Sequence, residues 1–174
     1  MIKRIRIIGG PGSGKTHLAI QLSKKLNIPA YDLDDVKWEK KFDLPRDPSK
    51  RDAELKVILK KKQWILEGVY GDWSCVSFGR AQCIIVLQPN THIRTLRVIM
   101  RFVRKKLRLE KSEKESSWKS FKDLMSWSAK YYRDDFPEIY AYIKPHEHKV
   151  LTISESNLDA EKLIAVLNKH QDYK

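Results

Sequence analysis

The chain has 174 residues, of which 41% are hydrophobic and 33% charged, and a formal net charge of +13. These values fit one globular domain with a buried core. No apolar run approaches the ~20 residues that span a bilayer, so we expect no membrane segment and a cytoplasmic protein. The two cysteines, Cys75 and Cys83, lack the spacing of a metal site and are expected to be free thiols.

Short apolar runs separated by helical patterns occur along the whole chain. In chain order, the runs predict strands over residues 3–8, 30–33, 64–67, 83–87 and 150–153. Helical spacing and end signals predict helices over 15–26, 49–62, 90–109, 118–135 and 158–169. Alternating strands and helices indicate an α/β fold, a five-stranded parallel sheet with helices on both faces. Ligands of such sheets bind at the carboxyl ends of the strands.

For two of these helices, the sequence predicts which side chains form the apolar face. For the helix over 49–62 we expect Ser49 as the N-cap and an apolar face that contains Ala53, Val57 and Ile58. In the helix over 90–109, one stripe of apolar side chains is expected to face the core. Its members are Leu96, Met100, Val103 and Leu107.

The first predicted strand runs into Gly-Gly-Pro-Gly-Ser-Gly-Lys-Thr at residues 9–16. This is the G-x-x-x-x-G-K-[ST] pattern of a phosphate-binding P-loop, placed between a strand and a helix. The backbone N–H groups of Gly10, Gly12, Ser13 and Gly14 would surround a polyphosphate. Lys15 would face the β- and γ-phosphates, and Thr16 would bind Mg²⁺. We therefore expect ATP and Mg²⁺ as cofactors, with His17 also in the nucleotide site.

Acidic residues follow the second and third strands. Asp32, Asp34 and Asp35 lie beside the expected P-loop, and Asp34 is our candidate for a general base or a Mg²⁺ ligand. The alternative is helix capping or a solvated loop. Glu67 ends the third strand, where it could organise Mg²⁺ together with Thr16 and Asp34; the alternative is an exposed strand-end acid.

Arginines concentrate on one face of the helix over 90–109, and residues 91–122 hold eleven basic against three acidic side chains. The spacing of 3, 4, 3, 4 aligns Arg94, Arg97, Arg101, Arg104 and Arg108. This row spans about 21 Å, so it is too long for one phosphoryl centre. Arg97, Arg101 and Arg104 are expected to reach phosphate, while Arg94 and Arg108 would be exposed or bind another anion. The alternative is a solvated basic face.

Other basic and aromatic residues have two interpretations each. Arg133 could be delivered to the γ-phosphate by a lid, or could pair with Asp134 on the surface. Arg46 and Arg51 could bind an anionic acceptor. The aromatic residues near the basic stretch could stack on bases or form the core of a helix pair; they are Trp118, Trp127, Tyr131 and Tyr132.

Several segments together resemble the adenylate-kinase-like P-loop kinases, and most closely the group of topology modulation proteins. They are the P-loop at 9–16, Asp-Leu-Asp-Asp-Val-Lys-Trp at 32–38, Trp-Ile-Leu-Glu-Gly-Val-Tyr-Gly at 64–71, the strand and proline at 84–89, and the Arg-rich helix. The resemblance implies ATP-dependent phosphoryl transfer and a helical lid. It also implies that 154–157, with Asn157, contacts adenine.

The leading hypothesis is a Mg²⁺- and ATP-dependent kinase of a small acceptor, most naturally a nucleotide or nucleoside. Its catalytic residues would be Lys15, Asp34, Arg97, Arg101 and Arg133. We expect one domain over 1–174, with an acceptor-binding insertion at about 34–62 and a basic lid at about 104–133, as a monomer or homodimer. Alternatives are an ATP-binding regulator associated with DNA, for which no DNA-reading motif is visible, and a nucleotide-binding protein without activity.

Overall fold

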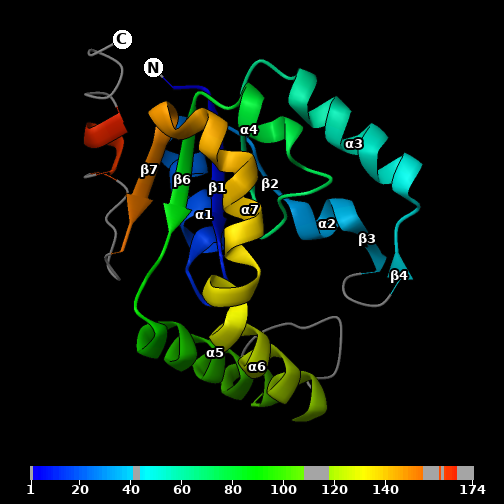
Figure 1. The fold of residues 1–174 in the computed structure, drawn as a ribbon, viewed down its shortest axis with the longest axis vertical. Coiled ribbons are helices and arrows are strands. Elements are labelled where there is room, and N and C mark those ends of the chain that lie inside the picture. The colour runs from blue at the N-terminus through cyan, green and yellow to red at the C-terminus, as the bar shows by residue number, and fades with distance from the viewer. Residues whose placement is uncertain (1, 41–43, 108–117, 155–160, 162, 168–174) are drawn as a thin grey trace.

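The computed structural model describes residues 2–40, 44–107, 118–154, 161 and 163–167. Its centre is a five-stranded sheet in the order β2-β5-β1-β6-β7, in which every neighbouring pair is parallel (Figure 1). The strands are β1 (Arg4–Gly9), β2 (Ala30–Asp32), β5 (Trp64–Glu67), β6 (Cys83–Leu87) and β7 (Val150–Ile153). The predicted α/β fold is confirmed, and three of the strands have the predicted bounds.

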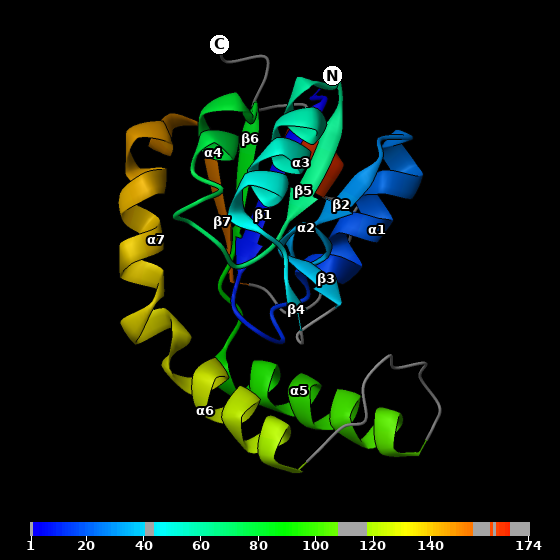
Figure 2. The ribbon, with the colours of Figure 1, turned by 90° about the vertical axis from the view of Figure 1, so that its right-hand side faces the viewer.

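Side chains alternate between the two faces along each strand, so both faces of the sheet carry apolar residues. Helices cover both faces. On one face, Ile5 and Ile7 of β1 pack in a cluster with Leu18 and Leu22 of α1 (Lys15–Leu26). Leu163, in the helical residues 163–167, joins this cluster. The opposite face packs against α3 (Pro48–Lys60), α4 (Val76–Arg80) and α7 (Phe136–Ile143) (Figure 2). Because helices cover both faces of the sheet, a ligand can approach it only at the ends of its strands.

Some short elements are additional to the prediction. Helix α2 (Leu33–Lys37) follows β2 directly, and a hairpin of β3 (Trp38–Lys40) and β4 (Leu44–Pro45) comes next. Near the end of the chain lie α7 and the 3₁₀ helix η1 (Lys144–Lys149). Pro137 lies beyond α6, in the first turn of α7, where its missing N–H removes no helical hydrogen bond.

Helices α5 (Thr91–Lys106) and α6 (Trp118–Asp134) lie beyond the carboxyl ends of the strands in both views (Figures 1 and 2). The prediction for the apolar stripe of α5 is wrong, because all four of its members are exposed: Leu96, Met100, Val103 and Leu107. Helix α5 instead packs on α6, where the Phe102 ring stacks on Phe121 with centroids 4.2 Å apart. A helix outside the sheet has only part of its surface covered by the core.

Helix α3 also differs from the prediction. Its N-cap is Asp47, whose carboxylate accepts hydrogen bonds from the N–H groups of Ser49 (2.9 Å) and Lys50 (3.4 Å). The face that it buries contains Leu55, Ile58 and Leu59, whereas Ala53 and Val57 are exposed. Moving the cap from Ser49 to Asp47 starts the helix two residues earlier, with Pro48 at its first position, where proline suits a helix start. In the described part of the chain, none of the helices has the length and hydropathy needed to cross a membrane.

Candidate functional site

The P-loop forms the link between β1 and α1, at the carboxyl edge of the sheet. Gly12 and Gly14 have φ angles of 72° and 94°, a region that side chains rarely adopt. A Cβ on Gly12 would lie 2.6 Å from the carbonyl oxygen of Arg94, so this turn also needs glycine for space. The loop carries Gly10, Gly12, Ser13, Gly14, Lys15 and Thr16 into one place, while His17 is exposed on α1. The helix N-terminus behind the loop suits a polyphosphate.

Glu67, at the end of β5, lies against the P-loop. The Thr16 hydroxyl donates a hydrogen bond of 2.6 Å to Glu67 Oε1, and the Glu67 residue is only 2% exposed. The alternative of an exposed strand-end acid is therefore wrong. Burial raises the pKa of Glu67, and the charge of Lys15 opposes part of that shift. The site thus joins a lysine, a hydroxyl and a carboxylate on one side of the loop.

The residues around Glu67 fit a Mg²⁺ ion. Glu67 Oε2 is buried without a hydrogen-bond partner among the described residues, which leaves a carboxylate oxygen for a ligand. Magnesium in kinases is held by one or two protein groups, with phosphate and water as the other ligands. No group of three or more His, Cys, Asp or Glu residues in the described chain would hold a metal alone. A site completed by the nucleotide phosphates matches this small donor set.

The pH dependence of stability gives a test of Glu67. Its pKa is raised in the folded state, so the unfolded state loses its proton first and the folding free energy weakens as the pH rises through that range. Glu67→Gln should remove this decline, because an amide does not titrate. Urea unfolding of both proteins between pH 4.5 and 8 checks this expectation. Parallel pH curves for wild type and variant would contradict it.

The acids after β2 have separate roles. The Asp32 carboxylate accepts a hydrogen bond of 2.8 Å from the N–H of Asp34 and caps α2, so the capping alternative holds for Asp32. Asp34 accepts a hydrogen bond of 2.7 Å from the Tyr70 hydroxyl. Both carboxylates lie near enough to Glu67 to raise its pKa. Burial, helped by Asp34, raises the pKa of Tyr70, which keeps this hydroxyl a donor at neutral pH.

Arginines of α5 divide into buried, bridging and exposed residues. Arg94 is 2% exposed and donates to the carbonyl of Ser128 at 2.8 Å, so the prediction that it faces solvent or an anion is wrong. Its position faces α6, which a spacing argument could not show. Arg97 donates to the carbonyls of Gly12 (3.4 Å) and Ser13 (3.2 Å), on the P-loop itself. Arg101 and Arg104 are exposed farther along α5.

Two tyrosines of α6 contact the P-loop, a role that the sequence did not reveal. The Tyr132 hydroxyl accepts a hydrogen bond of 3.0 Å from the N–H of Gly10 and donates to the carbonyl of Leu87. The Tyr131 ring is so close to Gly10 that a Cβ there would lie 2.6 Å from it. Tyr131 and Tyr132 thus follow the helix-core alternative rather than forming an open stacking surface. Their only sequence signal is the adjacent pair itself.

The remaining sequence candidates lie outside this cluster. Arg133 is exposed and pairs with Asp134, with 2.6 Å between Arg133 Nε and Asp134 Oδ1. Arg46 pairs with Glu54, and Arg51 pairs with Asp52 at 2.8 Å. Asn157 and Arg108 lie outside the described residues.

Arg6 is a second residue that the sequence did not reveal. It is fully buried in β1, where it donates to the carbonyls of Gly68 (3.3 Å) and Tyr70 (2.9 Å) and to the hydroxyl of Ser77 (3.2 Å). Burial lowers the pKa of Arg6 to about 10, which leaves it charged at neutral pH. The guanidinium therefore fixes the segment after Glu67, which contains Tyr70. In the sequence, Arg6 follows Arg4 by two residues in a strand, and such alternation of charged residues is typical of side chains that face solvent.

Known structures share this architecture. The chain is similar to a shikimate kinase from Bacteroides thetaiotaomicron, with a TM-score of 0.63 and 16% identity over 97% of this chain and 99% of that one. It is similar to the Acinetobacter baumannii enzyme in complex with shikimate, with a TM-score of 0.57 and 16% identity over 97% and 94%. The Aquifex aeolicus enzyme gives a TM-score of 0.52 at 16% identity over 97% and 96%.

No family model and no curated protein sequence matches the chain. At this low identity the similar structures establish the fold. The chain has the P-loop α/β fold that shikimate kinases also have.

Proposed function

We propose that the protein transfers the γ-phosphoryl group of ATP to a hydroxyl group of a small acceptor. One observation carries the proposal: the P-loop with Lys15 and Thr16 adjoins the buried Glu67, whose second carboxylate oxygen has no partner in the described chain. Such a donor set matches what phosphoryl transfer requires, which is charge neutralisation and positioning. The sequence most resembles the topology modulation proteins, and we propose that the chain is a member of that group.

The residues divide the reaction between them. The acceptor oxygen attacks the γ-phosphorus, a new P–O bond forms, the bond to the bridging oxygen breaks, and ADP leaves. Lys15 offsets charge on the β- and γ-phosphates, and Asp34 takes the proton of the attacking hydroxyl. When bound, Mg²⁺ neutralises phosphate charge, with Thr16 and Glu67 as its protein-side groups and Asp34 as a further candidate. Arg97 supports the loop by binding its carbonyl oxygens.

The catalytic assignments of Arg101 and Arg133 remain part of the proposal. Both side chains are exposed, and Arg133 already pairs with Asp134. Their participation requires α5 and α6 to move towards the nucleotide when it binds, as lids of kinases do. His17 and Asn157 are likewise proposed nucleotide contacts.

An acceptor screen tests the proposed function. ATP consumption is followed with nucleotides, nucleosides, sugars and amino alcohols, since the sequence favours a nucleotide or nucleoside and the fold admits other small molecules. We expect at least one class to raise consumption about tenfold above the rate without acceptor. MgATP binding with no stimulation by any class would contradict the proposal and leave a nucleotide-binding protein without transferase activity.

A role on DNA is the second candidate, favoured by the exposed Arg101 and Arg104 on α5. Contacts to several phosphates would make binding fall steeply with salt concentration. A duplex titration at about 50 mM salt and again at about 200 mM checks it. Absence of binding at the lower concentration would remove this candidate.

A further inference from the structure

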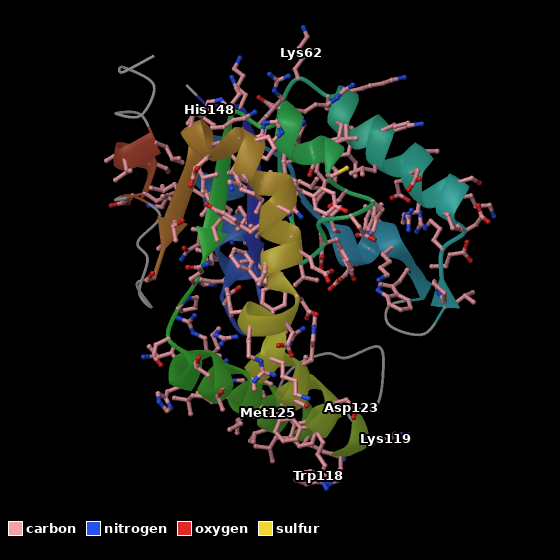
Figure 3. The ribbon with its side chains drawn as sticks, in the orientation of Figure 1. Lys62, Trp118, Lys119, Asp123, Met125 and His148 are labelled. Atoms are coloured by element: carbon pink, nitrogen blue, oxygen red, sulfur yellow. The ribbon has the colours of Figure 1, made fainter. Side chains whose placement is uncertain are left out.

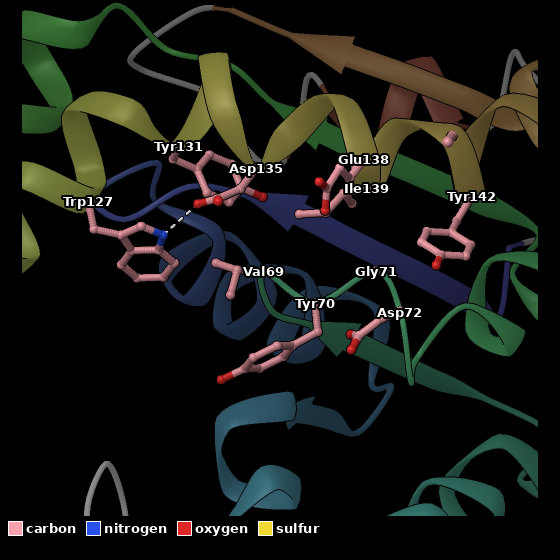
Figure 4. A pocket seen from close by; sticks show the side chains of 11 residues that line it. Val69, Tyr70, Gly71, Asp72, Trp127, Tyr131, Asp135, Glu138, Ile139 and Tyr142 are labelled. Atoms are coloured by element: carbon pink, nitrogen blue, oxygen red, sulfur yellow. Dashed lines mark hydrogen bonds between the residues drawn. The ribbon is translucent and has the colours of Figure 1, made fainter.

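A cavity lies beside residues 69–72, the segment that follows Glu67. It has a volume of about 750 Å³ and opens between the segment that follows β5 and helices α6 and α7 (Figure 4). Tyr70 and Asp72 line it on one side, and Trp127, Tyr131 and Glu138 are among the residues on the other. This volume is in the range of small-molecule sites.

The charge of the lining is opposite to that of the chain. Eleven described residues line the cavity, and they include the carboxylates of Asp72, Asp135 and Glu138 but no Lys, Arg or His. Asp135 accepts a hydrogen bond of 2.7 Å from the indole N–H of Trp127. In the described part of the chain, the carboxylates of Asp72 and Glu138 take part in no hydrogen bond or ion pair. In a protein of net charge +13, this local excess of negative charge favours a cationic ligand.

A buried hydroxyl in the lining also lacks a partner. Tyr131 is 1% exposed, and its hydroxyl oxygen is buried without a hydrogen-bond partner among the described residues. Its ring is held edge-on to Trp127, with centroids 6.0 Å apart, and to Tyr132, with centroids 4.9 Å apart. A buried polar group without a partner is costly by about 1–3 kcal/mol, but protein atoms enclose this oxygen, so a ligand gains affinity from it only by displacing the side chains that cover it. This observation is independent of the carboxylates.

Aromatic rings complete the lining. Trp127 and Tyr142 each expose two fifths or more of their surface, and Tyr70 also belongs to the wall. Aromatic faces attract ammonium groups, and the same side chains bind the apolar faces of sugar-like rings. Two cations lie near the lining without belonging to it: Lys37, with its Nζ 4.4 Å from the centroid of the Tyr70 ring, and the buried Arg6, which donates to the carbonyl of Tyr70 at 2.9 Å. The carboxylates and aromatic faces, with the unpartnered Tyr131 hydroxyl behind them, match an amine that also carries hydroxyl groups.

The cavity wall touches both halves of the proposed reaction centre. The Tyr70 hydroxyl donates to Asp34 at 2.7 Å, and the Tyr131 ring packs on Gly10 of the P-loop. Tyr70 and Tyr131 therefore link the cavity wall to the proposed base and to the phosphate-binding loop, although neither Asp34 nor a P-loop residue lines the cavity itself. The sequence analysis considered Arg46 and Arg51 as contacts of an anionic acceptor. In the structure, Arg46 pairs with Glu54 and Arg51 pairs with Asp52.

We propose that this cavity binds the phosphoryl acceptor, and that the acceptor is a small polyhydroxyl compound carrying an ammonium group. This inference rests on the proposed function and narrows its acceptor from small hydroxyl compounds in general. In the transfer, one hydroxyl of the acceptor becomes a phosphate ester, its proton goes to Asp34, and ADP is released. The ammonium group stays charged beside Asp72 and Glu138.

Charge-matched sugars test the inference. The probes are glucosamine, glucose and gluconate, which are cationic, neutral and anionic, and the larger pair kanamycin and maltotriose. Binding is measured by calorimetry with and without a non-hydrolysable ATP analogue, and ATP consumption is measured separately. We expect the amines to bind at least about tenfold more tightly than their neutral counterparts. Equal or tighter binding of gluconate or of a nucleoside monophosphate would overturn the inference.

Two variants and a control locate the effect. Asp72→Asn combined with Glu138→Gln should weaken amine binding about tenfold or more, and should leave the binding of neutral sugars unchanged. Tyr131→Phe should weaken amine binding severalfold without lowering the melting temperature, because its hydroxyl has no partner in the free protein. Asp123→Asn is the control, since Asp123 is exposed near the outer end of α6 (Figure 3).

The outcomes separate the two proposals. Amine binding that the double variant abolishes, without ATP consumption, would support the amine site and contradict the kinase. ATP consumption with a neutral or anionic acceptor, unchanged in the double variant, would support the kinase and overturn the inference. No amine binding to either protein would also overturn it.

Discussion

Lys15→Ala is expected to lower the rate of phosphoryl transfer about 10³-fold or more, the largest effect on activity that we expect from one substitution. Lys15 is the first residue of α1 and its charge acts on the buried Glu67. Without it, Glu67 and the phosphates would repel one another with no cation of the loop between them. The measurement is the rate of phosphorylated product formation with saturating MgATP and the acceptor found by screening.

The control for Lys15 is Lys24→Ala, since Lys24 is exposed in the last turn of the same helix. It removes an equal charge from α1 at the far end from the loop, so its rate should stay within about twofold of wild type. Thermal unfolding of both variants verifies that the fold persists. A folded Lys15→Ala protein with the wild-type rate would refute the assignment of the loop.

Arg6→Ala should destabilise the fold by about 4 kcal/mol. The substitution leaves a cavity between β1 and Phe78, whose ring centroid lies 5.3 Å from the guanidinium carbon. It also leaves the buried carbonyls of Leu66 and Gly68 without the donor that now reaches both at 3.3 Å. The free energy of unfolding in urea measures the change. Catalysis should fall too, because Tyr70 and the segment around it lose their attachment.

Arg4→Ala is the matched control for Arg6, because Arg4 is on the same strand and only half-buried. Its loss should change the unfolding free energy by less than about 0.5 kcal/mol. A similarly small effect for Arg6→Ala would mean that the guanidinium does not hold the segment after Glu67.

Strands and the first helix could be predicted well from the sequence because their signals are local. The bounds of β5, β6, β7 and α1 agree with the predictions, since continuous apolar runs, glycine and proline mark their ends. Helix α5 shows the limit of that reasoning. Periodicity identified an apolar stripe but not which side meets the core, and Val98 rather than Leu96 is buried. Which side of α5 is buried depends on the position of this helix beyond the sheet.

The site was predictable where one motif or one strand end defines it. The P-loop, Asp34 and Glu67 come from short segments, and parallel strands bring them to the same edge. Tyr132 and Arg6 were not found because their partners, Gly10 and Tyr70, are 122 and 64 residues away along the chain. The cavity that we propose for the acceptor likewise combines residues 69–72 with α6 and α7, whereas the sequence favoured an insertion at about 34–62.

The central claim is that the P-loop and Glu67 form a MgATP site, and titration calorimetry with ATP tests it most directly. The wild-type protein is titrated with Mg²⁺ present, then with the metal chelated, and Lys15→Ala is titrated in parallel. The account predicts saturable binding with Mg²⁺ that weakens about tenfold on chelation and is lost in the variant. Absence of binding to the wild type with Mg²⁺, or equal binding to the variant, would contradict it.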